Sequence, residues 1–386
     1  MTPHLASSTH IGVDYISSFG TGGNGRYTRE LVRALSGISP RERFFCYTYV
    51  HHLFPFPRYR APRENIEFGG AYFPSFPIAI FTKLGNAASR RLLRYRVKKD
   101  SLDIMHFTNP LFFVEDLPPS AKVATTIHDL APLIDSSWVR SDTAGRFAAA
   151  LPAIVRRSDA LIAVSESTRR DLVRFFPDAA GKTSVVYEGV RGHAEEENAK
   201  IGESEKSRYI LTVGEIQPRK NLEILLDAYA GLPEDVRRRY VLIHAGDART
   251  PQEQERFLDE IRRRGLGDSV RVLGWVPDTE LERWYRGAAV FAFPSLYEGF
   301  GLPVLEAMAC GIPAVVSRSS SMPEVGGDAV LYFDPKNPDE LRERLLLALG
   351  DPALRKSLRE KGIARAKQFS WECTARETLE VYRRII

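Results

Sequence analysis

One pattern in the sequence constrains the fold more than any other: short apolar runs alternate with helical stretches along most of the chain. Each run ends in glycine or polar residues, as 122–127 does before His128. Strands and helices that alternate in this way form parallel sheets, whose strand carboxyl ends meet at one side. The pattern stops at a charged stretch, 191–207, and restarts at Tyr209. We therefore predict the α/β class, with two doubly wound domains.

The length and composition agree with this division. At 386 residues the chain exceeds the size at which one hydrophobic core usually stops growing. Cys46, Cys310 and Cys373 lie far apart without metal-ligand spacing, and no apolar run approaches the ~20 residues that span a bilayer. With no signal peptide either, we expect buried thiols and a cytoplasmic protein.

The domain boundaries follow from the breaks in the pattern. Residues 191–207 are charged and poor in apolar side chains, which is typical of a linker. The two domains would then comprise residues 1–190 and 208–368. The last segment, 369–386, has an apolar stripe at helical spacing, which predicts a docking helix.

A glycine-rich loop follows the first predicted strand, 11–16. Gly20, Gly22 and Gly25 satisfy the G-x-G-x-x-G dinucleotide fingerprint. That fingerprint also needs an acid after the second strand to hold a ribose, but two histidines follow the strand at 44–50. A dehydrogenase is therefore a weak alternative, although the glycines still indicate a backbone that approaches a phosphate or a sugar closely.

Polar side chains follow the buried strands of the first half. His128 and Asp129 come directly after 122–127, and Ser165 comes after 161–164. Ligands of doubly wound domains bind at the carboxyl ends of the strands, so these residues are candidates for a site. An isolated histidine is more often structural than catalytic, and Ser165 is also placed to cap the next helix.

The stretch 294–313 carries the most informative motif of the second half. Glycines lead into a helix that we expect to begin at Pro303, because proline suits the first helical position. A helix N-terminus attracts phosphate. Glu298 precedes this helix and Glu306 is expected on its first turn, where both are placed to accept hydrogen bonds from sugar or ribose hydroxyls. Alone, the stretch also fits a turn with two solvated acids.

Two cations, Arg219 and Lys220, lie beside another helix start, which Asn221 is placed to cap. Such a pair suits a diphosphate, since arginine offers a planar fork and lysine a point charge. A solvated pair is the alternative. The chain has no Asp-x-Asp to hold a divalent metal, so we expect no metal and a leaving group stabilised by these cations and helix dipoles.

The region between residues 51 and 100 is less regular. A helical stretch, 86–99, carries basic side chains at Arg90, Arg91, Arg94, Arg96, Lys98 and Lys99. Cations near aromatic residues suit an anionic membrane surface, and a solvated helix face explains them as well. The patch matches no nucleic-acid-binding motif, so we expect no nucleic-acid partner.

The motifs together resemble one family. Glu298 and Glu306 form an E-x7-E pair like that of the retaining glycosyltransferases of family 4, which have the GT-B fold, with two Rossmann-like domains that face each other across a cleft. The resemblance covers essentially the whole chain. The motifs that accompany the glutamate pair, in the family's order, are 22–28, 128–129, 165–167, 218–221, 320–324 and 369–371.

The resemblance implies roles for individual residues. Residues 1–190 would bind the acceptor and 208–368 the nucleotide-sugar donor, and the helix at 369–386 would cross back onto the first domain. The catalytic residues would be His128, Glu298, Arg219 and Lys220, with Glu298 and His128 on the sugar and the cations on the diphosphate. The other donor-binding residues would be Gly23, Gly214, Gly274, Trp275, Val276, Phe300, Gly301, Leu302 and the ribose ligand Glu306. The acceptor side of the cleft would be lined by Asn24, Asp129 and Ser165.

The sequence departs from the family pattern at one point. Many members have an arginine after the glycine of the diphosphate loop, but here Glu215 follows Gly214. A carboxylate cannot bind diphosphate, so Arg219 would have to supply the second cation.

The motifs are most similar to those of bacterial mannosyltransferases of O-antigen and exopolysaccharide assembly. The resemblance therefore implies transfer of a hexose, mannose from GDP-mannose, to a saccharide or lipid-linked saccharide, with retention and without a cofactor. The protein would be cytoplasmic, or peripheral on the inner face of the plasma membrane. UDP-sugars are alternative donors. A nucleotide-sugar epimerase and a nucleotide-sugar-binding protein without transfer activity are alternatives of other classes.

Overall fold

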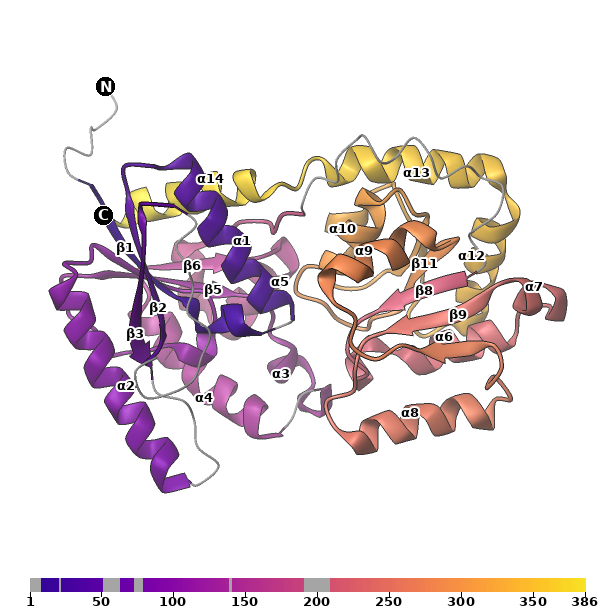
Figure 1. The fold of residues 1–386 in the computed structure, drawn as a ribbon, viewed down its shortest axis with the longest axis horizontal. Helices are drawn as coiled ribbons and strands as arrows, with labels where there is room; N and C mark the ends of the chain where they lie inside the picture. The colour runs from indigo at the N-terminus through magenta and orange to yellow at the C-terminus, as the bar shows by residue number, and fades with distance from the viewer. Residues whose placement is uncertain (1–7, 21, 51–62, 73–78, 139–140, 191–208) are drawn as a thin grey trace. The chain divides into compact units, whose positions relative to one another are not determined.

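The protein forms two compact units. The computed structural model describes residues 8–20, 22–50, 63–72, 79–138, 141–190 and 209–386 (Figure 1). The predicted linker, 191–207, lies outside the described residues. The first unit comprises Met1–Ile134, Arg140–Gly189 and Trp371–Ile386, and the second comprises Asp135–Val139 and Val190–Ser370.

The first unit is built on a seven-stranded parallel sheet with the order β3-β2-β1-β4-β5-β6-β7. The order reverses beside β1, which is the mark of a doubly wound domain. Its strands are β1 His10–Asp14, β2 Arg43–Tyr49, β3 Ile66–Tyr72, β4 Ile104–Phe107, β5 Lys122–Ile127, β6 Ala160–Ala163 and β7 Thr183–Val185. Its helices are α1 Gly23–Ile38, α2 Ala79–Lys99, α3 Ala131–Ile134, α4 Ser141–Arg157, α5 Glu166–Phe175 and α14 Trp371–Ile385.

The second unit repeats the plan with six parallel strands in the order β10-β9-β8-β11-β12-β13. The predicted α/β class with two doubly wound domains is therefore confirmed. The strands are β8 Tyr209–Val213, β9 Val241–Ala245, β10 Val270–Val272, β11 Val290–Phe293, β12 Ala314–Ser317 and β13 Leu331–Phe333. The helices are α6 Leu222–Ala230, α7 Glu234–Arg239, α8 Pro251–Arg263, α9 Asp278–Gly287, α10 Leu302–Ala309, α11 Met322–Gly326, α12 Pro338–Gly350 and α13 Pro352–Ala366.

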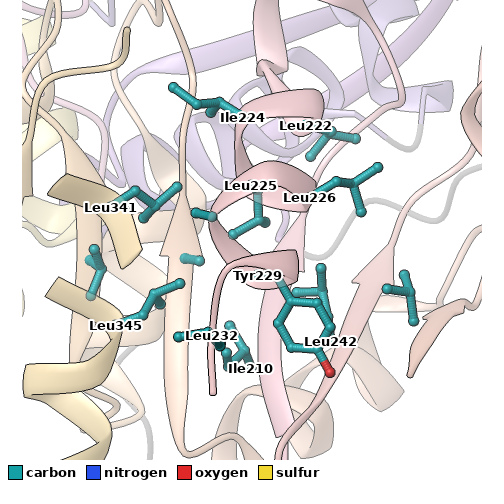
Figure 2. Packing of buried hydrophobic residues seen from close by; sticks show 14 of the residues in the cluster. Ile210, Leu222, Ile224, Leu225, Leu226, Tyr229, Leu232, Leu242, Leu341 and Leu345 are labelled. Carbon is teal, nitrogen blue, oxygen red and sulfur yellow. The ribbon is translucent and has the colours of Figure 1, made fainter. Parts of the chain in front are cut away.

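Helix α6 shows how the core of the second unit fixes the strands that carry the candidate site. Apolar residues recur along one side of α6 at helical spacing, and they pack with α12 over the sheet (Figure 2). Tyr229 is completely buried, and its hydroxyl donates to the Tyr240 carbonyl at 2.9 Å. Burial of a side chain such as Leu225 contributes roughly 1.5–3 kcal/mol to folding. This packing holds β8 and β11 as a rigid support for the loops at their carboxyl ends.

The C-terminal helix α14 belongs to the first unit, where it lies alongside α1 (Figure 1). The Tyr382 hydroxyl lies 2.6 Å from Nδ1 of His106, and Nε2 of His106 lies 2.8 Å from the Thr126 hydroxyl. Burial lowers the pKa of His106 to about 3, so its ring is neutral. The docking of α14 therefore rests on a buried polar chain as well as on apolar packing. Cys373, on this helix, is exposed, so the expectation of three buried thiols was wrong at this position.

Helix α2 begins before the predicted stretch 86–99 and presents its cations to solvent. Arg96 is the exception, because it is half-buried and donates to the Gly70 carbonyl at 3.3 Å. The exposed cations are Arg90, Arg91, Arg94, Lys98 and Lys99. Within the described parts of the chain, no helix combines the length and the apolar character needed to cross a membrane.

Candidate functional site

The loop after β11 leads into α10 through a glycine that no other residue replaces easily. Gly301 has a φ of +114°, and a Cβ there would lie 2.4 Å from Cε of Met322. Helix α10 begins directly after it, at Leu302, rather than at Pro303 as predicted. Glu306 consequently lies on the second turn rather than the first.

A buried cluster of three charged side chains lies beside this loop. Nζ of Lys220 donates to Oε1 of Glu298 at 2.6 Å, and Nη1 of Arg219 donates to Oε2 at 2.6 Å. Glu298 and Lys220 are only 8% and 9% exposed. The glutamate and the cations were expected to bind different parts of a ligand, and the structure brings them into direct contact.

The charges of this cluster interact strongly because the three side chains are largely buried. Burial alone would raise the pKa of Glu298, but the charges of Arg219 and Lys220 outweigh it and lower that pKa to about 2. Burial lowers the pKa of Lys220, and the Glu298 carboxylate opposes this change. The three side chains together carry one net positive charge at the carboxyl ends of β8 and β11, and the exposed carboxylate of Glu215, just after β8, opposes part of it. Such a site attracts an anion.

The backbone holds the cations against the loop. The Arg219 carbonyl accepts from the Leu296 N–H at 2.9 Å, and the Arg219 guanidinium also donates to the Tyr297 carbonyl at 2.9 Å. Asn221 adopts a left-handed conformation with a φ of 55°, so its amide points to the loops and donates to the Pro294 carbonyl. The expectation that the Asn221 side chain caps α6 was therefore wrong, because α6 receives no cap bond from it.

Three glycines allow close packing of the loops at the ends of the neighbouring strands. Gly214 has a φ of +144°, and a Cβ on it would lie 3.2 Å from Cε of Lys220. A Cβ on Gly246 would lie 2.0 Å from the Gly214 carbonyl oxygen, and the Gly246 N–H donates to the Gly274 carbonyl at 2.8 Å. These glycines let two loops and a lysine approach more closely than any side chain would allow. Glu215, the departure from the family pattern, is exposed.

The turn after β10 carries an exposed aromatic residue. Trp275 is 55% exposed, and its backbone N–H donates to Oδ1 of Asp247 at 2.9 Å. Val276 is half-buried beside it. Gly274, Trp275 and Val276 thus lie in the loops at the carboxyl ends of the second sheet, together with Gly214.

Glu306 is also held by a partner that sequence analysis missed. Its Oε2 accepts from the Tyr285 hydroxyl at 2.9 Å, and Tyr285 is 2% exposed on α9. Phe300 and Leu302, between the two glutamates, are buried. A buried tyrosine hydroxyl needs a hydrogen-bond partner, but the sequence alone does not say which partner it finds.

In the first unit, His128 lies between two acceptors at the carboxyl ends of the strands. Nε2 lies 2.9 Å from the Thr108 carbonyl, and Nδ1 lies 3.1 Å from Oε1 of Glu188. A carbonyl and a carboxylate only accept hydrogen bonds, so these partners favour the protonated ring, in which both nitrogens donate. Asp14 is fully buried nearby, accepts from the Thr108 N–H, and has its pKa raised to about 7 by burial. Glu188 and Asp14 were not anticipated, and contact between His128 and a sugar stays a prediction.

The charge on His128 predicts a dependence of stability on pH. Burial alone would lower the pKa of His128, but the Glu188 carboxylate and other nearby acceptors raise it above the ordinary value. The protonated ring therefore stabilises the fold fully below about pH 6.5, and this contribution is lost as the pH rises through the higher folded pKa. We expect Glu188→Gln to lower the His128 pKa, measured by NMR titration of the imidazole protons.

The other groups that face His128 define the control for this titration. Asp14 and Asp129 also act on its charge, and neutral His106 and Tyr27 are close. Because these groups remain in the variant, only the contribution of Glu188 is removed. An unchanged His128 titration in Glu188→Gln would show that the Glu188 carboxylate does not raise the His128 pKa.

The remaining predicted residues of the first unit lie at helix starts. Gly23 is the first residue of α1, and Asn24 follows it, exposed. Asp129 accepts from the Ala131 N–H at 3.0 Å at the start of α3. Ser165 is fully buried, and its hydroxyl accepts from the Thr168 N–H at 3.0 Å, so it caps α5 as expected. Asp129 and Ser165 therefore have local structural roles at the starts of α3 and α5.

Two family models match the chain, one in each half. The model "Glycosyltransferase Family 4" matches residues 21–191, and "Glycosyl transferases group 1" matches residues 193–365. Together they cover most of the chain, and one ends at residue 191 while the other begins at residue 193.

Curated relatives agree with these models. The O-antigen chain mannosyltransferase B of Escherichia coli is 43% identical over 176 residues, which cover 45% of this chain and 45% of that protein. The serotype-specific mannosyltransferase WbdA of E. coli is 33% identical over 275 residues, which cover 69% of this chain and 34% of that protein. The matches thus span less than half of either relative's own length.

Solved structures share the fold. The sucrose-phosphate synthase of Thermosynechococcus elongatus is 21% identical, with a TM-score of 0.77 over 98% of this chain and 99% of that chain. Anabaena HepE in complex with UDP-glucose is 18% identical, with a TM-score of 0.73 over 97% of this chain and 99% of that chain. The resemblance predicted from the E-x7-E motifs is confirmed, and the chain belongs to the family 4 glycosyltransferases.

Proposed function

We propose that the protein is a retaining α-mannosyltransferase that moves mannose from GDP-mannose to a saccharide or lipid-linked acceptor in cell-surface polysaccharide synthesis. The observation that carries this proposal is the buried cluster of Glu298, Arg219 and Lys220. Its excess positive charge suits a diphosphate, and its carboxylate suits sugar hydroxyls. The names of two relatives support mannose as the sugar.

In this proposal each part of the cluster has its own chemical task. As the bond between the sugar C1 and the phosphate oxygen breaks, charge builds on the diphosphate, and Arg219 and Lys220 stabilise it. Glu298 retains lone pairs beyond its two ion pairs, and these accept hydrogen bonds from sugar hydroxyls. Glu306, oriented by Tyr285, would hold the ribose.

Proton transfer in the reaction needs a base. In the proposed mechanism the acceptor oxygen bonds to C1 on the face that the leaving group departs from, so the configuration is retained. The acceptor's proton passes to an oxygen of the departing phosphate. His128 is poorly suited to take this proton, because its two acceptor partners favour the form in which both ring nitrogens already carry one.

The role of each unit and the location of the protein complete the proposal. The second unit would bind the nucleotide sugar and the first the acceptor. Attachment to the inner face of the plasma membrane through the exposed cations of α2 stays a prediction. Sedimentation with anionic and with neutral vesicles tests it, and equal binding to both would contradict it.

A panel of nucleotide sugars tests the donor. We expect GDP-mannose to raise the melting temperature and to be slowly hydrolysed in the presence of EDTA, while UDP-glucose, UDP-galactose, UDP-N-acetylglucosamine and NAD do less. A response to a UDP-sugar alone would replace the proposed donor. Loss of turnover with EDTA would show that a metal is required.

The same panel separates the alternative classes. An epimerase would change the sugar's configuration in the nucleotide sugar without any acceptor. A nucleotide-sugar-binding protein would be stabilised by the ligand but would neither hydrolyse nor transfer it, even with oligomannoside acceptors. Product analysis by chromatography distinguishes these results.

A further inference from the structure

The contacts of Glu298 show that the two cations are already occupied by an anion of the protein itself. Each carboxylate oxygen lies 2.6 Å from one cation, Lys220 Nζ or Arg219 Nη1. The side chains of Glu298, Arg219 and Lys220 are 10%, 15% and 11% exposed, so water screens these ion pairs little. The carboxylate therefore stands where a phosphate oxygen of a ligand would compete for the same donors.

This competition follows from charge. The cluster has two positive charges and one negative charge, whereas a nucleoside diphosphate carries several negative charges. A phosphate that reaches Arg219 and Lys220 comes close to the Glu298 carboxylate, and like charges in a poorly screened site repel strongly. Glu298 stays ionised over the physiological range, since its pKa is held at about 2. The repulsion therefore acts whenever a diphosphate is bound.

A sugar attached to the diphosphate reduces the net repulsion between the ligand and Glu298. Hydroxyls on the donor sugar donate to lone pairs of Glu298 that the two cations do not use, and they offset part of the repulsion. Once the sugar has been transferred, the nucleoside diphosphate has no such hydroxyls, and the full repulsion returns. The intact donor and the spent nucleotide thus differ in how they interact with a single side chain.

We propose that Glu298 acts as an internal competitor of the diphosphate for Arg219 and Lys220, so that it weakens binding of the spent nucleotide more than binding of the donor. This inference rests on the proposed function, because it assumes that the cations bind a nucleotide diphosphate. It gives Glu298 a second task, in product release, beside its expected contact with the sugar.

Calorimetric titration with GDP and with GDP-mannose tests this proposal. Glu298→Gln keeps the shape of the side chain and removes its charge. We expect the variant to bind GDP at least about 10-fold more tightly than the unaltered protein, the size of effect that freeing a charge-assisted contact produces. Its affinity for GDP-mannose should rise less or fall. The ratio of the two dissociation constants should therefore shift toward GDP.

Three further variants test whether the effect comes from the charge of Glu298 acting on the cations. Glu298→Ala should also tighten GDP binding, whereas the double variant Glu298→Gln with Arg219→Gln should lose that gain, because it removes one cation with the anion. Glu234→Gln is the matched control, since Glu234 pairs with Arg238 on the exposed helix α7 and should leave GDP binding unchanged. Circular dichroism confirms that each variant is folded.

The outcomes separate this inference from the proposed donor. Unchanged or weaker GDP binding in both folded Glu298 variants would overturn it. If the unaltered protein binds UDP but not GDP, the proposed donor fails, and the same comparison with UDP then decides the role of Glu298. A variant too unstable for calorimetry is tested by its melting temperature, which should rise more with nucleotide than that of the unaltered protein.

Discussion

Lys220→Met should lower the rate of sugar transfer by about 10²- to 10³-fold, which is the usual effect of removing one preorganised donor to a developing negative charge. Lys220 is 9% exposed, and its ammonium lies 2.6 Å from Glu298 and 5.0 Å from the centre of the Phe293 ring. Methionine has a similar length without the charge, so the variant isolates the ammonium group.

The measurement is the initial rate of product formation with saturating acceptor. In the variant, Glu298 keeps Arg219 as a partner, so the carboxylate is not left without a cation and we expect the fold to persist. Lys356→Met, which changes an exposed lysine of α13, is the matched control and should retain full activity. A rate for Lys220→Met within a factor of two of the unaltered protein would remove Lys220 from the catalytic residues.

Gly246→Ala should destabilise the protein by about 3 kcal/mol, since it combines an unfavourable backbone conformation with a backbone clash. Gly246 has a φ of +149°, and an added Cβ would lie 2.0 Å from the Gly214 carbonyl oxygen. A backbone oxygen cannot rotate away as a flexible side chain can. Gly214 must move instead, and it packs against Lys220, so we expect weaker nucleotide binding as well.

Urea unfolding followed by circular dichroism measures the loss of stability, and calorimetry measures nucleotide binding. The matched control is Gly267→Ala, because a Cβ at Gly267 would meet nothing within 4 Å and its φ is not in the left-handed region. A midpoint for Gly246→Ala equal to that of the control would show that the loops rearrange without cost.

The overall architecture could be predicted because its signal is local and repeated. Each strand and the helix after it can be recognised from the spacing of apolar residues within about 20 positions. Where the local signal is weak, prediction failed: β3 contains Gly69 and Gly70, which are poor strand formers, and it lies in the region described as irregular. Its pairing with β2 is what makes it a strand.

The sequence allowed us to predict which residues belong to the site, but not which of them contact one another. Glu298 and Lys220 are separated by 78 positions, and nothing in either local sequence indicates that they pair. Asn221 looked like a helix cap, but its left-handed backbone turned the amide to other loops. Tyr285 and Glu188 were missed because a tyrosine in a helix and an acid after a strand have many possible partners. Only the packing of distant strands decides among them.

The placement of α14 has a consequence for the order in which the protein is made. Tyr382 is 276 positions from His106, and the first unit is complete only when both are present. The second unit is almost continuous in sequence, from Val190 to Ser370, so its residues all leave the ribosome before α14 does. During synthesis the second unit can finish folding first, while in the first unit Nδ1 of His106 still lacks its hydrogen-bond partner on α14.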